Sequence, residues 1–444
     1  MKFEVDSQTA KDLELFDKRK DERSIFSLFN HTLTIGGYNK LKETFASPLS
    51  DIKRLENRVQ AIIYFENSSV PFEIDKVWFD LIDYYLIQDK KPTKLSIVDI
   101  VRKSVDRKVR PSNKTYIIQR GILCLVKTIN ELYEFANKID AETVPEYIAN
   151  YKHTITNTIE STNLRFALLK RNKKRIGFIW IGKFDFYFRY SDYESIIKLL
   201  DIVYEIDMFG SVAIAKRKLG LSYPKYNSTQ VDINIKGLFH PFIKNPVSND
   251  LKINHQKNLC FLTGPNMAGK STYLKSFGIS VYLSHIGFPV PAQSMETFVF
   301  CGLYSSINIA DNVSKGYSHY YSEVLRIKFI AEQISQRKNV IVIFDELFRG
   351  TNVKDAYEAS LAVISAFAKV SKSLFAISTH LIEVADELKA FSCIDFKYFE
   401  IAIENDIPRY TYKLKEGFTN ERLGLYILKK EKVLETIAES GNQP

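Results

Sequence analysis

The sequence predicts a helical region over its first half and an α/β domain over its second half. Three observations support this fold class. Apolar residues recur at helical spacing through most of residues 1–230. From residue 231 onward, short apolar runs bounded by turn residues alternate with helical stretches. An apolar run at 258–263 leads directly into a glycine-rich loop and a helix, which places a candidate site in the second half.

The helical half is predicted from four stretches of periodic apolar residues. Around Pro48 the pattern is interrupted, and Ser50 and Asp51 are placed to cap the next helix. The last stretch has an apolar side that includes Leu199 and Val203. The four stretches are 41–65, 118–139, 147–169 and 193–219.

The α/β half is predicted from short apolar runs. Residues 231–235 alternate like a strand, and the turn at His240 and Pro241 follows. Three more runs are rich in buried-type residues and lie between helical stretches, which favours a buried and largely parallel sheet. They cover 258–263, 339–344 and 374–378. We place the domain boundary at about residue 230.

The composition indicates a soluble globular protein. The chain has 444 residues, enough for two or three domains, with 45% hydrophobic and 26% charged residues. Acidic residues interrupt the start of the chain, so no signal peptide is expected, and no apolar run approaches the ~18 residues of a membrane span. The four cysteines are scattered without CxxC spacing, which is typical of reduced packing residues. We expect a cytoplasmic protein.

The charge balance suggests a polyanionic partner. The net charge is +10, which favours binding to nucleic acid or to an anionic membrane surface. Basic residues gather at 102–114 and at 170–175. Each cluster is either a DNA contact or a solvated helix face, and the composition leaves both interpretations open.

The glycine-rich loop matches the phosphate-binding pattern GxxxxGK[ST] without a gap. Its backbone N–H groups and the start of the following helix suit phosphate oxygens. Lys270 would supply positive charge to the phosphates, and Ser271 a hydroxyl ligand for Mg²⁺. ATP and Mg²⁺ are therefore the expected ligands. The nucleotide-binding residues are predicted to be Gly264, Pro265, Asn266, Met267, Ala268, Gly269, Lys270, Ser271 and Thr272.

Two acidic residues follow the apolar run at 339–344. Carboxylates at the end of a buried strand lie where open α/β sheets bind ligands. Asp345 would hold Mg²⁺, and Glu346 would take a proton from the attacking water as the general base. Further on, His380 follows the run at 374–378 and fits a sensor of the γ-phosphate. The alternatives are a solvated turn for the acidic pair and a structural role for the histidine.

Four segments resemble the MutS family of DNA repair proteins. GPNMAGKST at 264–272 is similar to the family's GPNMGGKST, and DELFRGT at 345–351 to its DEIGRGT. STH at 378–380 is similar to ATH, and GYSHYYSE at 316–323 to GxSTFxxE. The likeness extends more weakly to residues 34–58 and 200–213, which resemble the start and the end of the helical core domain.

The resemblance implies an α/β ABC-type P-loop ATPase domain at 231–415, preceded by an all-α core (lever) domain at 1–230. A short helical tail at 416–444 would clasp a second subunit. In a homodimer, Gly316 and Ser318 of one subunit would close over the ATP of the other. The implied function is ATP hydrolysis that gates a DNA clamp in mismatch repair or recombination. Mismatched or branched DNA and downstream repair proteins would be the partners. The alternative is an ABC-type ATPase that serves a protein partner and has no direct DNA role.

The sequence departs from the family pattern in four respects. No counterpart of the N-terminal mismatch-reading domain is expected, because the core pattern begins near residue 10. The stretch between about 70 and 230 is short for long levers and a large clamp. Pro246 occupies the position where an aromatic residue usually stacks on adenine. Ala268 replaces a glycine of the loop, a change that is tolerable if its φ stays negative.

Overall fold

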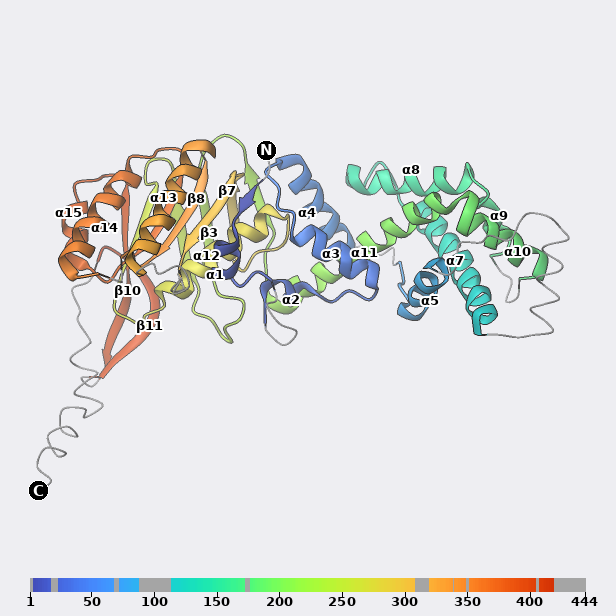
Figure 1. Cartoon of the computed structure of the whole chain (residues 1–444), viewed down its shortest axis with the longest axis horizontal. Helices are drawn as coiled ribbons and strands as arrows, with labels where there is room; N and C mark the ends of the chain where they lie inside the picture. The colour runs from blue at the N-terminus through green and yellow to red at the C-terminus, as the bar shows by residue number, and fades with distance from the viewer. Residues whose placement is uncertain are drawn as a thin grey trace, which may run out of the picture. The chain divides into compact units, whose positions relative to one another are not determined.

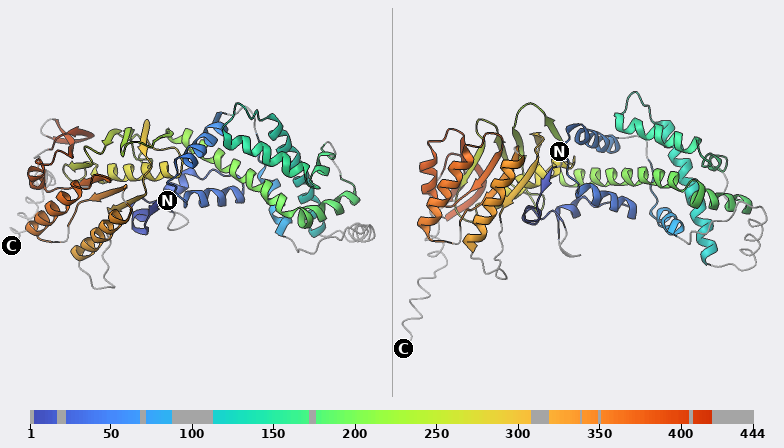
Figure 2. Two further views of the ribbon diagram at one scale, coloured as in Figure 1. Left: turned by 90° about the horizontal axis from the view of Figure 1, so that it is seen from above. Right: turned by 45° about the horizontal axis from the view of Figure 1, so that its top comes forward.

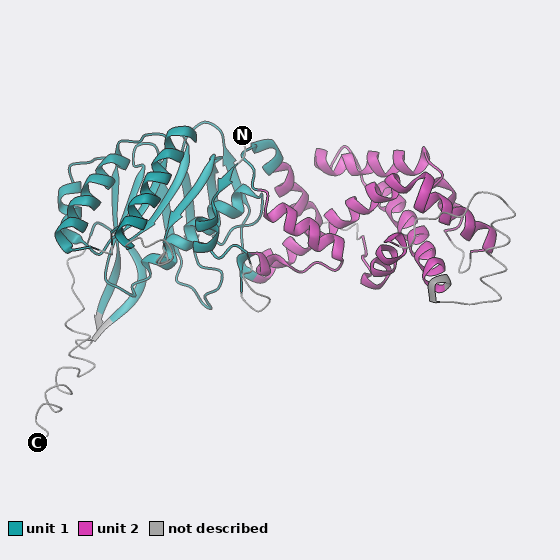
Figure 3. Ribbon diagram, viewed as in Figure 1, with its two compact units in different colours: residues 1–25, 48–55, 219–444 teal, residues 26–47, 56–218 magenta. Residues whose placement is uncertain are grey.

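The computed structural model divides the chain into two compact units (Figures 1 and 3). One unit comprises residues 1–25, 48–55 and 219–444, and the other comprises residues 26–47 and 56–218. The structure describes residues 3–16, 23–67, 72–87, 113–171, 176–307, 319–337, 339–348, 351–404 and 407–418. We call the two units the sheet unit and the helical unit.

This division differs from the predicted one, which had a single boundary near residue 230. The main part of the sheet unit begins at residue 219, and residues 1–25 belong to it as well. The physical reason is a strand pairing between distant residues, because Glu4 and Val5 pair in parallel with Gly302 and Leu303. The tail expected at 416–444 lies almost wholly outside the described residues, since the described part ends at residue 418.

The helical unit contains the helices expected from the apolar spacing. Its elements, some of which reach into the sheet unit at one end, are α2 (Ile25–Phe29), α3 (Ile35–Phe45), α4 (Ile52–Asn67), α5 (Lys76–Ile87), α7 (Asn113–Lys138), α8 (Glu146–Glu160), α9 (Arg165–Leu168), α10 (Phe178–Phe186), the π-helix η1 (Tyr187–Ser191) and α11 (Tyr193–Leu219). The described parts of the expected stretches at 41–65, 118–139, 147–169 and 193–219 are largely helical, which confirms this half of the prediction.

Helix α3 begins at a buried polar junction with α11. The hydroxyl of Thr34 caps α3 by accepting a hydrogen bond from the Gly37 N–H at 2.9 Å. The carboxylate of Asp207 in turn accepts bonds from the Leu33 N–H at 2.9 Å and from the Thr34 N–H at 2.8 Å. A Cβ atom at Gly37 would lie 2.1 Å from Asp207 Oδ2, so only glycine lets the helices approach this closely.

The sheet unit is built on a seven-stranded sheet of order β1-β7-β8-β9-β5-β10-β11, in which only the β10–β11 pair is antiparallel. The predicted buried, largely parallel sheet is therefore confirmed. The strands are β1 (Glu4–Val5), β5 (Leu259–Thr263), β7 (Gly302–Ser306), β8 (Val340–Asp345), β9 (Leu374–Ser378), β10 (Ile394–Glu404) and β11 (Ile407–Glu416).

Helices cover both faces of this sheet (Figures 1 and 2). Val342 and Phe344 of β8 belong to a core cluster with side chains of α13 (His319–Arg337), α14 (Val353–Ala368) and α15 (Ile382–Leu388). Ile343 points the opposite way, toward α12 (Lys270–His285), because successive residues of a strand alternate between faces. A second sheet of order β2-β6-β3-β4 consists of β2 (Pro224–Asn227), β6 (Ser294–Phe298), β3 (Ile233–Leu238) and β4 (Asn249–Ile253).

His285, the last residue of α12, is fully buried and makes a hydrogen bond through each ring nitrogen. Nδ1 lies 2.8 Å from the Val281 carbonyl oxygen, and Nε2 accepts the Phe300 N–H at 2.9 Å. The ring stacks on Phe3 with centroids 3.9 Å apart. Burial lowers the pKa of His285 to about 4, because the charged imidazolium would lose its hydration.

This histidine should make folding stability depend on pH. Its pKa is lower in the folded state than the ordinary 6.5, so its contribution is present above pH 6.5 and is lost as the pH falls toward 4. Between pH 7.5 and pH 5 the loss should be about 2 kcal/mol. Urea unfolding of the parent and of His285→Gln at both pH values measures this loss in the free energy of unfolding. Equal pH dependence in the two proteins would contradict the assignment.

Candidate active site

The loop predicted to bind phosphate lies between β5 and α12. Gly264 and Gly269 have φ values of 134° and 104°, in the region that favours glycine. Met267 also has a positive φ of 69°, and its side chain is 77% exposed at the outer side of the loop. Ala268 is not among the residues with positive φ, and it is buried. An alanine therefore fits this position of the loop without backbone strain.

Lys270, the first residue of α12, is directed back toward the loop. Its ammonium group donates to the Gly264 carbonyl oxygen at 2.7 Å and to the Pro265 carbonyl oxygen at 3.1 Å. The side chain is 4% exposed, and Nζ lies 3.8 Å from Glu346 Oε1. The structure thus brings together two residues that are 76 positions apart and were predicted to act on the same phosphate.

Asp345 and Glu346 lie at the end of β8, as the sequence predicted. Asp345 is 4% exposed, and its Oδ1 accepts a hydrogen bond from the Ser378 hydroxyl at 2.5 Å. Glu346 has a φ of 59°, a value that costs energy in a residue with a Cβ atom. Its N–H donates to the Ser378 carbonyl oxygen at 3.0 Å, which fixes this turn against β9.

His380 reaches the same carboxylate from the neighbouring strand. Its Nδ1 lies 3.6 Å from Glu346 Oε2, and its side chain is 51% exposed. The carboxylate of Glu346 therefore lies within 4 Å of both Lys270 and His380. Ser378, which positions both acidic residues, was missed by the sequence reasoning as a site residue. Only the pairing of Asp345 with Ser378 across β8 and β9 identifies it.

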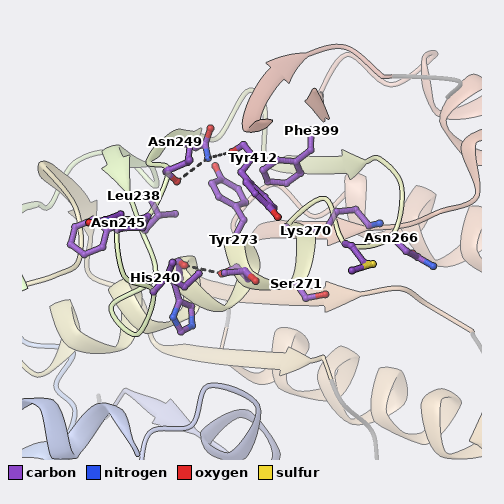
Figure 4. A pocket seen from close by; sticks show the side chains of 18 of the residues that line it. Leu238, His240, Asn245, Asn249, Asn266, Lys270, Ser271, Tyr273, Phe399 and Tyr412 are labelled. Atoms are coloured by element: carbon purple, nitrogen blue, oxygen red, sulfur yellow. Dashed lines mark hydrogen bonds between the residues drawn. The ribbon is translucent and has the colours of Figure 1, made fainter. Parts of the chain in front are cut away.

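A cavity of about 600 Å³ opens beside the loop (Figure 4). It extends from the loop to the segment between β3 and β4 and to the β10–β11 hairpin. Of the predicted site residues, Gly264, Ala268, Asp345 and His380 are not part of its lining. Those that line it are Pro265, Asn266, Met267, Gly269, Lys270, Ser271, Thr272 and Glu346.

Aromatic residues line the far side of the cavity, and the sequence reasoning missed them. Tyr412 of β11 is 46% exposed and has a φ of 56°. The amide of Asn249 donates to the Tyr412 carbonyl oxygen at 2.9 Å and accepts the Leu414 N–H at 2.8 Å, so it ties β11 to β4. Phe399 lies nearby, in edge contact with Tyr273 at 5.9 Å between centroids. No local spacing in the sequence relates these residues to the loop.

Several predicted features lie outside the described residues. Gly316 and Ser318 do, and so do most positions of the basic clusters at 102–114 and 170–175. Their predicted roles stay predictions. Over the part of the chain that is described, no helix is both long enough and apolar enough to cross a membrane.

The sheet unit is an α/β domain in which a strand, a glycine-rich loop and a helix follow one another, as in phosphate-binding loops. The same chain also contains the helical unit. Comparison with family models identifies both parts. The model of MutS domain V matches residues 260–443, and the model of MutS domain III matches residues 8–213. The chain belongs to the MutS family.

Individual relatives agree with this assignment. The chain is 26% identical over 348 residues to the DNA mismatch repair protein MutS of Petrotoga mobilis, covering 74% of this chain and 41% of that protein. The MutS of Persephonella marina is 25% identical over 461 residues, with coverages of 94% and 50%. The MutS of Lactococcus lactis subsp. lactis is 29% identical over 239 residues, with coverages of 52% and 28%. The chain thus spans half or less of the length of these relatives.

Proposed function

We propose that this chain is a Mg²⁺-dependent ATPase of the ABC type that works as a homodimer on DNA. The observation that carries the proposal is the position of the Glu346 carboxylate, 3.8 Å from Lys270 Nζ and 3.6 Å from His380 Nδ1. A general base must lie beside the groups that hold the phosphate it acts upon. Glu346 follows β8, Lys270 begins α12 and His380 follows β9, so three elements of the sheet unit bring these groups close together.

In the proposed reaction, Lys270 and the N–H groups at the start of α12 bind the β- and γ-phosphates. Glu346 accepts a proton from a water molecule whose oxygen forms a bond to the γ-phosphorus, while the bond to the leaving ADP oxygen breaks. His380 orients the γ-phosphate and Glu346. Ser378 acts on the same centre indirectly, because it holds Asp345 through a 2.5 Å hydrogen bond.

The residues present fit Mg²⁺. Ser271, the second residue of α12, is exposed, and Asp345 offers a carboxylate at the end of β8. Mg²⁺ prefers oxygen ligands and usually takes only one or two from the protein, with water and phosphate oxygens completing the shell. Ser271 and Asp345 would hold the ion, which would neutralise charge on the phosphates.

The dimer and the DNA role rest on the family. The relatives compared are named DNA mismatch repair proteins, and the two matched models are those of MutS domains III and V. We infer that Gly316 and Ser318 contribute to the partner's ATP site and that closure of the paired sites gates binding of DNA by the helical unit. The net charge of +10 agrees with a polyanionic ligand.

Steady-state ATPase activity with a panel of nucleic acids tests this function. The panel contains matched duplex, mismatched duplex, a four-way junction and single strands, each at two salt concentrations. We expect stimulation by one DNA form that weakens steeply with salt, as phosphate contacts require. ATP hydrolysis that no DNA changes would reject the DNA role and favour the alternative of a protein partner. Absence of hydrolysis would reject the enzyme.

Tyr412 is expected to provide the aromatic surface for the nucleotide base, in place of the residue replaced by Pro246. Tyr412→Ala should weaken ATP binding about tenfold, because stacking on an aromatic ring contributes roughly 1–3 kcal/mol per base. Stacking tolerates every base, so GTP binding should weaken by a similar factor. Tyr412→Phe and Lys413→Ala are the controls and should leave affinity unchanged. Calorimetric titration measures all four, and unchanged affinity in Tyr412→Ala would contradict the assignment.

A further inference from the structure

Residues 3–15, which we call the N-terminal segment, are built into the sheet unit although nearly 300 residues separate them from their partners. The segment begins with β1, which pairs with β7, and continues with α1 (Ser7–Asp12) (Figure 1). Phe3, Leu13 and Leu15 are buried. The segment therefore forms part of the folded ATPase half of the chain.

The N-terminal segment holds the carboxyl end of β7. The hydroxyl of Thr9 accepts the Ser305 N–H at 2.8 Å. Oδ2 of Asp12 accepts the Ser305 hydroxyl at 2.6 Å and the Ile307 N–H at 2.9 Å. Thr9 is 0% and Asp12 2% exposed, so each bond replaces lost hydration and would be costly to break. The position of the end of β7 is thus tied to α1.

Arg326 joins this junction to α13. The guanidinium of Arg326 donates to Asp6 Oδ2 at 2.6 Å and to Asp6 Oδ1 at 3.1 Å, and its Nε donates to the Ser305 carbonyl oxygen at 3.0 Å. The side chain is 10% exposed. Burial raises the pKa of Asp6, but the hydrogen bond and charge of Arg326 outweigh it and hold that pKa below its usual value. The forked geometry fixes both groups more tightly than a point charge would.

The same segment also contacts α12, which carries Lys270 and Ser271 at its start. A Cβ atom at Gly278 would lie 2.7 Å from Leu13 Cδ2, so the glycine allows Leu13 to lie directly on the helix. Glu14 pairs with Lys275 at 2.8 Å between Oε1 and Nζ. The N-terminal segment therefore bridges the phosphate-loop helix on one side and the junction of β7 and α13 on the other.

We propose that Asp6 and Arg326 are positioning residues for ATP turnover, which hold α13 and the end of β7 in a fixed place relative to α12. The proposal rests on the proposed function. Neither residue lines the nucleotide cavity, so neither should contribute to ATP affinity. Helix α13 begins at His319, directly after the residues predicted to serve the partner's ATP. The end of β7 also pairs with β8, where Ser306 lies opposite Phe344, the residue before Asp345. A shift of β7 and α13 would therefore misalign the groups that act on the phosphate, and misplacement by about 1 Å can cost a hundredfold in rate.

Arg326→Lys and Asp6→Asn test this role, because the lysine keeps the charge but loses the fork. We expect kcat for ATP hydrolysis to fall at least about tenfold, with Kd for ATP changed less than about twofold. The matched control is Arg337→Lys. Arg337 lies farther along the same helix and pairs with Glu4 of the same N-terminal segment, so the control makes the same chemical change at a more exposed arginine of α13. Its kcat should stay at the parental value.

Parental kcat in Arg326→Lys and Asp6→Asn, measured well below their unfolding temperatures, would overturn the proposal and leave the pair a purely stabilising role. Amide hydrogen exchange separates this failure from failure of the proposed function. In the parent, a non-hydrolysable ATP analogue should slow exchange at residues 303–307, and Arg326→Lys should lose that response. An equal response in both proteins would overturn the positioning role, even in a parent that does not hydrolyse ATP.

Discussion

Glu346→Gln should lower kcat for ATP hydrolysis at least about 100-fold while ATP binding is kept. The amide has the size of the carboxylate but cannot accept the proton of the attacking water, and a general base typically contributes about 10²–10⁴ in rate. Affinity for ATP should be equal or higher, because the change removes a negative charge beside the site that receives the γ-phosphate. Steady-state hydrolysis and nucleotide titration measure the two effects.

The Glu346→Gln protein should also accumulate as a nucleotide-bound dimer, which size-exclusion chromatography with ATP and Mg²⁺ detects. Glu358→Gln is the control, since Glu358 lies on α14 with 63% of its side chain exposed. Hydrolysis at the parental rate in Glu346→Gln would reject Glu346 as the base. A dimer that forms equally without ATP would reject the nucleotide dependence of dimer formation.

Lys270→Ala should abolish detectable ATP binding and with it hydrolysis. Lys270 is the buried cation of the loop, 4% exposed, and it would be the main positive charge facing the β- and γ-phosphates. Charge-assisted contacts in a poorly hydrated site contribute more than those on a surface, so a loss of at least about 100-fold in affinity is expected. Calorimetric titration with ATP and Mg²⁺ measures it.

The control for Lys270→Ala is Lys354→Ala, which removes a lysine that is 84% exposed on α14. It should leave both affinity and the free energy of unfolding unchanged, since exposed ion pairs contribute little. Urea unfolding must show that Lys270→Ala is folded. A folded Lys270→Ala protein that binds ATP with parental affinity would remove the loop from the proposed function.

Much of the candidate site was predictable because its residues lie in local patterns. The loop at 264–271 has a contiguous motif between a strand and a helix, and Asp345, Glu346 and His380 each follow an apolar run that proves to be β8 or β9. Parallel strands in one sheet end at the same edge, so placing these residues on strand ends was enough to expect them near each other. Their catalytic roles stay predictions that the variants above test.

Other parts of the site have no local signature. Tyr412 reaches the cavity because β11 closes the sheet beside β10 and is tied to β4 through Asn249. Ser378 reaches Asp345 because the register of β8 and β9 places the two residues opposite each other. Such contacts depend on strand order and register, and periodicity in a single segment reports neither.

The sequence by itself determined which half of the chain is mostly helical, that the other half holds a largely parallel sheet, and which loop, acidic pair and histidine make up the candidate ATP site. These features depend on spacing within short segments, and short-range sterics and burial patterns suffice to specify them. Only the tertiary structure decided that residues 3–15 complete the sheet, that Asp6 and Arg326 join β7 to α13, and that Tyr412 faces the cavity. The physical reason is that pairings between residues about 140 to 320 positions apart are selected by the packing of the whole unit, which no local pattern encodes.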